Sequence, residues 1–376
     1  MKVTLVRTRA IDSAVYKVAE TLSHNGYDVH LLVWDRQDDL KGRKGNGYTI
    51  CRFNLRAPYD KLTALFYLPI WWVYEFFFLL RDNPDVIHAC DLDTLVPAIP
   101  AKLIKRIKLC YTIYDFYANN LPDGRPHLVR KLIRSLVAAV EKFSIRFAQV
   151  LFLVDECRYE EVKGARINKL VYIYNSPPDY FDAKQRQKSG AGTEILIFYA
   201  GVIHKSRGLE HMTEAVENLD GVRLVVAGTG RDKGLIEESA RRCQRIQYIG
   251  WIPYEEVIRN TLEADILFAF YDPNIPADKY ASPNKLFEAM MCSKPILVSE
   301  GTALADKVQA ENCGLVVPYG NVSAIMEAMV RLKNDPNLVK ILGDNGRKAY
   351  EEKYRWDIMQ ERLLQAYKEW KGIETS

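Results

Sequence analysis

Residues 281–296 show most clearly the loop–helix–strand pattern of this chain and read Ala-Ser-Pro-Asn-Lys-Leu-Phe-Glu-Ala-Met-Met-Cys-Ser-Lys-Pro-Ile. The Ser-Pro-Asn start favours a turn followed by the first turn of a helix. The Lys-Pro pair ends that helix, and the apolar run at residues 296–298 is typical of a buried strand. A loop, a helix N-terminus and a strand therefore follow one another, and the N-terminus of a helix is a favourable place for a phosphate.

The same alternation of β-branched runs and helical patterns extends through the whole chain, as expected for βα units and parallel sheets. A first series of strands is predicted at residues 3–6, 29–33, 50–53, 86–88, 109–113, 150–154 and 171–173. A second series is predicted at residues 195–200, 222–227, 246–249, 266–270, 296–298 and 314–317. Prolines and glycines without periodicity separate the two series, as in a linker.

These patterns predict an α/β fold with two Rossmann-like, doubly wound domains facing a cleft. The N-terminal domain is expected at residues 1–175, the linker at 176–193 and the C-terminal domain at 194–355. The last helix, residues 356–376, is expected to pack back on the N-terminal domain. Ligands of such sheets bind at the C-terminal ends of the strands, so we expect the functional site there.

The composition is that of a globular protein. Of 376 residues, 48% are hydrophobic and 27% are charged, which excludes a disordered chain. The seven cysteines are scattered and include no Cys-x-x-Cys pair, so neither a disulfide framework nor a zinc site is expected, and a cytoplasmic location is favoured. Residues 3–6 are already strand-like, and we expect no signal peptide.

Positive charge is concentrated in the first half of the chain. Residues 1–180 carry 26 Lys and Arg against 20 Asp and Glu, whereas the remainder carries 26 against 28. The excess lies between residues 102 and 146, where ten Lys or Arg face three acidic residues. Such a zone fits anionic lipid or an anionic acceptor, and an ordinary solvated helix face is the alternative.

Two segments of the second half carry residue types that suit a diphosphate. Gly201 follows a predicted strand, where the missing side chain lets the backbone approach a phosphate, and Arg207 lies close behind it. Lys285 and Glu288 lie on the predicted helix of residues 281–296. A carboxylate among apolar neighbours is costly to bury without a partner, so Glu288 is either a ligand-binding residue or a surface residue.

These segments resemble the retaining glycosyltransferases of family 4, which have the GT-B fold. Residues 286–295 resemble the family sequence Leu-x-Glu-Ala-Met-x-x-Gly-x-Pro, whose glutamate holds the nucleotide ribose and corresponds to Glu288. A subset of the family carries Ser-x-Pro-x-Lys before this glutamate, and residues 282–285 resemble it. The loop at residues 201–208 resembles the family sequence Gly-Arg-Leu-x-x-x-Lys-Gly.

The resemblance implies that the C-terminal domain binds a nucleotide-sugar donor, with Arg207 and Lys285 as catalytic residues. Val202 occupies the place of the family arginine, for which Lys205 or Lys285 could substitute. The first of two family glutamates, which contacts the transferred sugar, is replaced by Tyr280. The implied donor-binding residues are Gly201, Lys205, Gly208, Gly230, Ile252, Tyr280, Ser282, Pro283, Asn284 and Glu288.

The acceptor is expected in the N-terminal domain. Residues 111–117 resemble the family segment Tyr-Asp-x-His-Glu, whose histidine lies near the donor sugar. Tyr117 stands in that place, so a histidine acid or base is not expected. Asp115 is predicted as a catalytic residue that binds sugar or acceptor. Arg7 and Arg9 follow the first strand and, with Tyr117, are predicted to bind the acceptor.

Two segments of the N-terminal domain suggest contact with a membrane. Residues 62–80 are rich in aromatic side chains, and we expect a helix that is partly buried and partly interfacial, with Trp71 and Trp72 at the interface. A plain core helix is the alternative. The helix predicted at residues 128–146 is basic and amphipathic. Together they favour a peripheral enzyme on the inner face of the cell membrane, with an anionic membrane surface as a partner.

The predicted function is the transfer of a sugar, with retention, from a UDP- or GDP-sugar to a glycan or lipid-linked acceptor in polysaccharide or glycolipid synthesis. No cofactor and no metal are expected, because no Asp-x-Asp pair follows a strand of the donor domain; Asp91-Leu92-Asp93 has that spacing but lies in the other domain. No nucleic acid partner is expected.

Two other functions stay open. A catalytically inactive homologue that binds a partner or a membrane is favoured by Tyr280 and Val202. A sugar-nucleotide 2-epimerase shares the architecture but needs several acids and histidines at its site, and the donor half has only His204 and His211.

Overall fold

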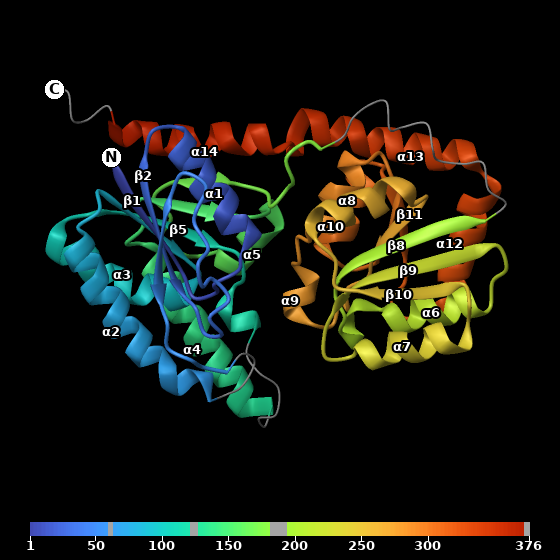
Figure 1. Ribbon diagram of the computed structural model, residues 1–376, viewed down its shortest axis with the longest axis horizontal. Helices are drawn as coiled ribbons and strands as arrows, with labels where there is room; N and C mark the ends of the chain where they lie inside the picture. Colours follow the sequence, from blue (N-terminus) through green and yellow to red (C-terminus); the bar gives the residue numbers. More distant parts are fainter. Residues whose placement is uncertain (59–62, 121–126, 181–193, 372–376) are drawn as a thin grey trace. The chain divides into compact units, whose positions relative to one another are not determined.

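The computed structural model describes residues 1–58, 63–120, 127–180 and 194–371, which form two compact units (Figure 1). The N-terminal unit is Met1–Tyr174 together with the chain from Met359 onward, and the C-terminal unit is Asn175–Ile358. The division between Tyr174 and Asn175 lies at the expected boundary, residue 175. The chain from Met359 onward, which includes most of the last helix, belongs to the N-terminal unit. Most of the predicted linker, residues 181–193, lies outside the described residues.

The N-terminal unit is built on a parallel sheet with the strand order β3-β2-β1-β4-β5-β6-β7. Its strands are β1 (Lys2–Arg7), β2 (Asp28–Trp34), β3 (Thr49–Phe53), β4 (Val86–Cys90), β5 (Lys108–Ile113), β6 (Val150–Leu153) and β7 (Leu170–Tyr172). Its helices are α1 (Ser13–His24), α2 (Ala64–Asp82), α3 (Leu92–Lys105), η1 (Tyr117–Asn119), α4 (His127–Ile145), η2 (Glu156–Arg158), α5 (Tyr159–Val162) and α14 (Trp356–Lys371). The strand order reverses between β1 and β4, and ligands of such sheets bind at this switch point.

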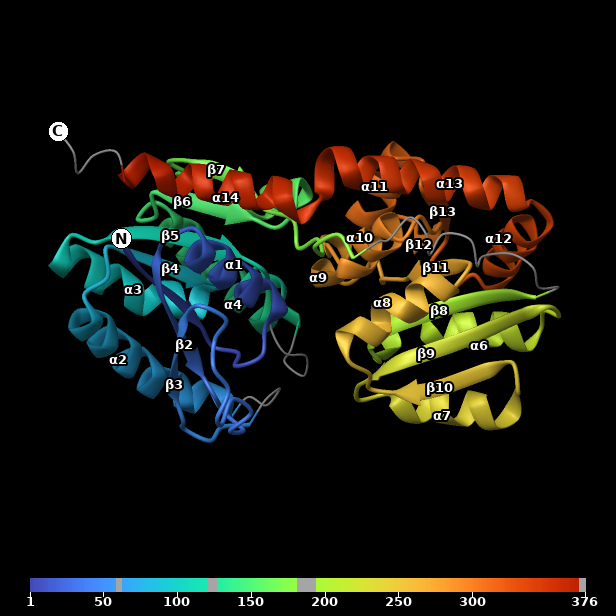
Figure 2. The ribbon, with the colours of Figure 1, turned by 45° about the horizontal axis from the view of Figure 1, so that its top comes forward.

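Helices α2, α3 and α4 lie over one face of this sheet, and α1 and α14 lie over the other (Figures 1 and 2). Helix α1 begins after Asp12, whose side chain accepts hydrogen bonds from the first amides of the helix. Helix α14 is tied to the sheet by the Tyr367 hydroxyl, 2.7 Å from His88 Nδ1. Burial lowers the pKa of His88 to about 3, so this histidine is a neutral core residue.

Helix α2 corrects one expectation. The Trp71 side chain is fully buried and stacks on Trp34 with 5.8 Å between ring centroids, and the Trp72 indole donates to the Asp93 carbonyl at 2.8 Å. Both indoles therefore point into the protein and not toward a membrane interface. Within the described ranges, no helix is long and apolar enough to cross a membrane.

The C-terminal unit is built on a second parallel sheet with the strand order β10-β9-β8-β11-β12-β13, which reverses between β8 and β11. Its strands are β8 (Ile195–Val202), β9 (Val222–Thr229), β10 (Ile246–Gly250), β11 (Ile266–Ala269), β12 (Ile296–Ser299) and β13 (Gly314–Val317). Its helices are η4 (Lys205–Arg207), α6 (Leu209–Glu217), α7 (Lys233–Arg242), α8 (Tyr254–Glu263), α9 (Pro276–Lys279), α10 (Asn284–Met291), α11 (Ala303–Ala310), α12 (Val322–Asn334), α13 (Pro336–Ala349) and the π-helix η5 (Tyr350–Tyr354).

The predicted fold class is confirmed: both units are α/β, with parallel sheets of buried, β-branched strands. Every predicted strand is present, with ends shifted by at most about two residues, as is usual for strand ends read from a pattern. The short helix α9 and the turn η4 were not predicted, because single helical turns leave no hydrophobic period.

Candidate functional site

Gly201 and Lys285 meet at the carboxyl end of β8. Gly201 has a φ of 153°, and a Cβ at this position would lie 2.6 Å from the Lys285 Nζ atom. Only glycine leaves room there for the ammonium, which lies 4.5 Å from the centroid of the Tyr199 ring. The glycine of the predicted loop therefore makes space for a lysine from α10.

Lys285 is the second residue of α10, and the residue before this helix, Pro283, provides no side-chain cap. Among the described residues, no carboxylate forms an ion pair with this ammonium, although the charge of Glu288 acts on it from further away. Burial lowers the pKa of Lys285 to about 8, and the positive charge of Arg207 acts in the same direction. A cation beside an open helix N-terminus is suited to bind phosphate.

Arg207 is fixed in the same region by a carboxylate and a ring. Its Nη1 donates to Asp278 Oδ1 at 2.7 Å, and its guanidinium lies 4.2 Å from the centroid of the Tyr271 ring. Asp278 is buried, and its Oδ2 has no hydrogen-bond partner among the described residues. The Arg207 side chain keeps 26% of its surface exposed.

Glu288 lies one turn after Lys285 and is buried, which excludes the alternative of a surface glutamate. Its carboxylate forms a hydrogen bond with the Tyr254 hydroxyl from α8, and burial together with the charge of Glu288 raises the pKa of Tyr254. This partner explains how the charge is tolerated inside the unit.

The other predicted donor-binding residues lie on neighbouring loops. Gly208 has a φ of 60° and packs on Phe270, while Gly230 packs on the Ile203 carbonyl; a Cβ would clash at both positions. The Lys205 amide donates to Asp232. The residues that precede helices α8 and α10 are Ile252, Tyr280, Ser282 and Pro283, followed by Asn284 as the first residue of α10. Their contacts with a donor remain predictions.

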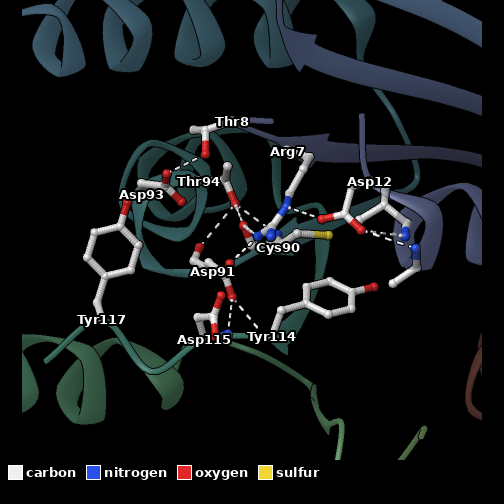
Figure 3. A network of polar contacts seen from close by, with 12 residues as sticks. Arg7, Thr8, Asp12, Cys90, Asp91, Asp93, Thr94, Tyr114, Asp115 and Tyr117 are labelled. Atoms are coloured by element: carbon white, nitrogen blue, oxygen red, sulfur yellow. Dashed lines mark hydrogen bonds and ion pairs between the residues drawn. The ribbon is translucent and has the colours of Figure 1, made fainter. Parts of the chain in front are cut away.

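In the N-terminal unit, the carboxyl ends of β1 and β4 share a network of charges (Figure 3). The buried Arg7 donates from Nε to Asp12 at 2.9 Å and forms an ion pair with Asp91, and its guanidinium lies 5.0 Å from the centroid of the Tyr114 ring. These contacts differ from the predicted contact with an acceptor, because the charge of Arg7 is balanced inside the protein. Arg9, in contrast, is exposed.

Asp115 and Tyr117 follow β5 and lie at the same edge of the sheet (Figure 3). The Asp115 side chain is 42% exposed and lies 3.7 Å from Arg158. The Tyr117 hydroxyl points toward the Asp93 carboxylate, and burial together with the charge of Asp93 raises the pKa of Tyr117. Asp93 also accepts the Thr8 hydroxyl at 2.5 Å. The roles of Asp115 in catalysis and of Arg7, Arg9 and Tyr117 in acceptor binding stay predictions.

The sequence analysis predicted no role in the site for five residues of these clusters, namely Thr8, Asp91, Asp93, Tyr254 and Asp278. The Asp91-Leu92-Asp93 pattern has the spacing of a metal-binding pair. In the described part of the chain, no group of three or more His, Cys, Asp or Glu side chains is arranged to hold a metal ion. The two aspartates instead contact β1 and the segment after β5.

Two protein families match consecutive parts of the chain. The family described as "Glycosyl transferase 4-like domain" matches residues 10–176, and the family described as "Glycosyl transferases group 1" matches residues 181–349. These ranges follow the two structural units.

Relatives and solved structures agree with these matches. The capsular polysaccharide biosynthesis glycosyltransferase CapM of Staphylococcus aureus is 26% identical over 46% of each chain, so the match spans less than half of CapM. The alpha-D-kanosaminyltransferase of Streptomyces kanamyceticus is 22% identical over 77% of this chain and 79% of its own length. Sucrose-phosphate synthase from Thermosynechococcus elongatus has a TM-score of 0.80 at 18% identity, covering 99% of this chain and 100% of its own. Anabaena HepE, solved with UDP-glucose, has a TM-score of 0.72 at 13% identity, covering 98% and 100%.

The structural matches show the fold, and the family matches show the kind of each domain. The chain belongs to the GT-B glycosyltransferases, with an N-terminal glycosyl transferase 4-like domain and a C-terminal domain of the glycosyl transferases group 1.

Proposed function

We propose that this protein is a retaining glycosyltransferase that moves a sugar from a UDP- or GDP-sugar to a glycan or a lipid-linked acceptor. The observation that carries the proposal is the Lys285 ammonium, which lies unpaired among the described residues at the open N-terminus of α10, close to Arg207. CapM and the kanosaminyltransferase are glycosyltransferases and HepE binds UDP-glucose, which supports this class of donor and reaction.

The proposed chemistry rests on the departing nucleoside diphosphate. Lys285 and Arg207 stabilise the negative charge that develops on its phosphates as the glycosidic bond breaks. Glu288 accepts hydrogen bonds from the ribose hydroxyls, as the family resemblance implies. Because two cations and a helix N-terminus supply positive charge for the phosphates, we propose that the reaction needs no metal ion. Retention of configuration and the Ser-x-Pro-x-Lys subset rest on the resemblance of residues 282–288.

We also propose that the N-terminal unit docks on the inner, anionic face of the cell membrane. Helix α2 exposes a row of large apolar side chains at helical spacing, namely Phe66, Ile70, Val73 and Phe77. Helix α4 exposes a second row, namely Leu128, Leu132, Leu136, Val140 and Phe143, beside the exposed cations Arg130, Lys131 and Arg134. Apolar rows flanked by cations match a surface of anionic headgroups over acyl chains, and this supports a lipid-linked acceptor.

An inactive homologue is a second candidate, and one observation favours it. Val202, in the place of the family arginine, is 63% exposed and supplies no charge to the donor site. The epimerase is less well supported, because His204 accepts the Ser206 amide and the His211 ring packs against Tyr319 at 5.5 Å between centroids. Both histidines of this unit are thus engaged in local contacts.

The test is the release of nucleoside diphosphate from a panel of UDP-, GDP- and ADP-sugars, with and without a membrane lipid extract, and with EDTA in parallel. The proposal expects release from a UDP- or GDP-sugar that increases with lipid and persists in EDTA. No release from any donor, with no thermal shift by any nucleotide, would favour the inactive homologue. A 2-epimeric sugar nucleotide as product would favour the epimerase, and loss of turnover in EDTA would refute metal independence.

A further inference from the structure

Asp91 has an unusual backbone for a residue with a side chain. It lies between β4 and α3 with φ of 68° and ψ of 167°, a region that glycine occupies readily and other residues rarely. It is also buried. A non-glycine residue persists in such a conformation only where its side chain makes contacts that offset the strain.

Those contacts lead to the segment that follows β5 (Figure 3). Asp91 Oδ1 accepts the amide of Tyr114 at 2.8 Å and the amide of Asp115 at 3.1 Å. Asp91 Oδ2 forms the ion pair with Arg7, which Asp12 holds from the other side. One carboxylate therefore ties the end of β1 to two successive amides after β5.

We propose that Asp91 is a positioning residue of the acceptor site, which holds the main chain at Tyr114–Asp115 and thereby sets where the Asp115 carboxylate stands. The inference rests on the proposed function, because it assigns Asp91 a task in binding the acceptor. Arg7 supplies the positive charge that balances the Asp91 carboxylate. The strained backbone turns the Asp91 side chain toward the segment that carries Asp115.

The neighbouring aspartate makes a parallel contact. Asp93 accepts the Thr8 hydroxyl from the end of β1 and faces the Tyr117 hydroxyl (Figure 3). Asp91 thus fixes the main chain, and Asp93 lies against a side chain of the same segment. Asp91 is the residue before α3 and Asp93 lies in the first turn of that helix, so both carboxylates lie just beyond the carboxyl end of β4.

The same unit contains a matched control. Asp35, at the end of β2, is buried and accepts the amides of Asp39 at 2.8 Å and Leu40 at 3.1 Å, with Arg52 Nε at 2.9 Å as its cation. It is the same combination of one carboxylate, two amides and one arginine, placed on a loop that carries neither Asp115 nor Tyr117. Loss of stability alone should therefore be similar for changes at Asp35 and Asp91.

The experiment compares Asp91→Ala, Asp91→Asn and Asp35→Ala in the full chain. Hydrogen exchange measured by mass spectrometry reports on the amides of residues 112–118 and 37–42. Rates with the donor identified in the panel report on transfer to the lipid extract and on hydrolysis to free sugar. Asp91→Ala is expected to expose the Tyr114 and Asp115 amides and to lower the ratio of transfer to hydrolysis by about tenfold, the order of one lost charge-assisted contact. Asp91→Asn, which keeps an oxygen that accepts these amides, is expected to restore most of the protection.

The pH profile gives a readout that a purely structural role would not change. Burial raises the pKa of Asp91 to about 6, against the opposing effect of Arg7. The other ionisable groups that act on Asp91, or on its Arg7 partner, include Asp12, Cys90, Asp93, Tyr111, Tyr114, Asp115, Tyr117 and Glu141. In the wild type, the ratio of transfer to hydrolysis should fall as pH drops through about 6 and the ion pair is lost. Asp91→Asn, which cannot ionise and lacks the ion pair with Arg7 at every pH, should show no pH-dependent decrease and should keep the ratio that the wild type reaches at low pH.

The outcomes separate the inference from the function on which it rests. No turnover of any donor by the wild type would refute the proposed function and the inference with it. Donor turnover with the same transfer-to-hydrolysis ratio in Asp91→Ala and Asp35→Ala would refute the inference alone. A lowered ratio in Asp91→Ala with unchanged protection of the Tyr114 and Asp115 amides would also overturn it, because the main chain would not be the link.

Discussion

Glu75, Asp91 and Glu288 are among the acidic side chains that are buried in the described part of the chain, and they differ in what surrounds them. Asp91 has an arginine and two amides, and Glu288 has the Tyr254 hydroxyl. The Trp71 indole lies near Glu75 and partly opposes the rise of its pKa, but neither oxygen of Glu75 makes a hydrogen bond of normal geometry among the described residues. An unpaired buried polar group is destabilising, so Glu75 is the one whose replacement should strengthen the fold.

The first residue-scale prediction concerns Glu75→Gln. Burial raises the pKa of Glu75 well above its ordinary value of 4.5, and the charge of Asp93 adds to this. Because the folded-state pKa is raised, the fold is most stable below the unfolded pKa, where Glu75 is protonated in both states. This stability is lost as pH rises from the unfolded pKa toward the folded pKa. Glu75→Gln should thus be more stable than the wild type at pH 8, by about 1–3 kcal/mol, and the difference should shrink toward pH 4.

Urea unfolding followed by tryptophan fluorescence at several pH values measures this difference. The exposed Glu160→Gln is the control, and it should leave the pH dependence unchanged. A wild type and a Glu75→Gln variant with parallel stability profiles between pH 4 and pH 8 would show that Glu75 finds a partner in solution.

Helix α2 shows how far a sequence can predict an element. Its length and its place between two strands predict a helix of the N-terminal domain, and the structure confirms this. Its orientation could not be predicted, because apolar residues surround the helix on all sides and leave no period that marks an inner face. Packing decides the matter: Trp71 stacks on Trp34, and Phe66 on the opposite side is 80% exposed.

An element-scale prediction follows for membrane binding. Phe66→Ser together with Phe77→Ser should weaken co-sedimentation with vesicles of any headgroup, because these side chains supply apolar contact. Replacing Arg130 and Lys131 by Gln should weaken binding only to vesicles with phosphatidylglycerol, by roughly ten- to thirtyfold, since each cation near an anionic surface contributes about 1 kcal/mol.

The control for both pairs is Ile341→Ser on α13, an exposed apolar side chain of the C-terminal unit. If the four N-terminal replacements sediment with phosphatidylglycerol vesicles as the wild type does, α2 and α4 do not face a membrane.

At the scale of the whole molecule, parallel strands explain why much of the candidate site could be predicted. The carboxyl ends of such strands lie at one edge of a sheet, so Gly201, Arg207 and Lys285 were expected near one another although 84 residues separate the first from the last. The pairing of side chains could not be predicted in the same way. The ion pair of Asp278 with Arg207 depends on the short helix α9, which is too short to produce a hydrophobic period in the sequence.

The measurement that tests the account most directly is a calorimetric titration of UDP and GDP into the wild type, Lys285→Met and Lys307→Met. Lys307 is the matched control, since its Nζ also lies over a ring, 5.1 Å from the Tyr354 centroid, but on α11. The account predicts that Lys285→Met loses about 1.5–3 kcal/mol of binding, or roughly ten- to a hundredfold in affinity for the preferred nucleotide, while Lys307→Met binds normally. Equal affinity of Lys285→Met and the wild type for both nucleotides would contradict the assignment of this lysine to the donor diphosphate.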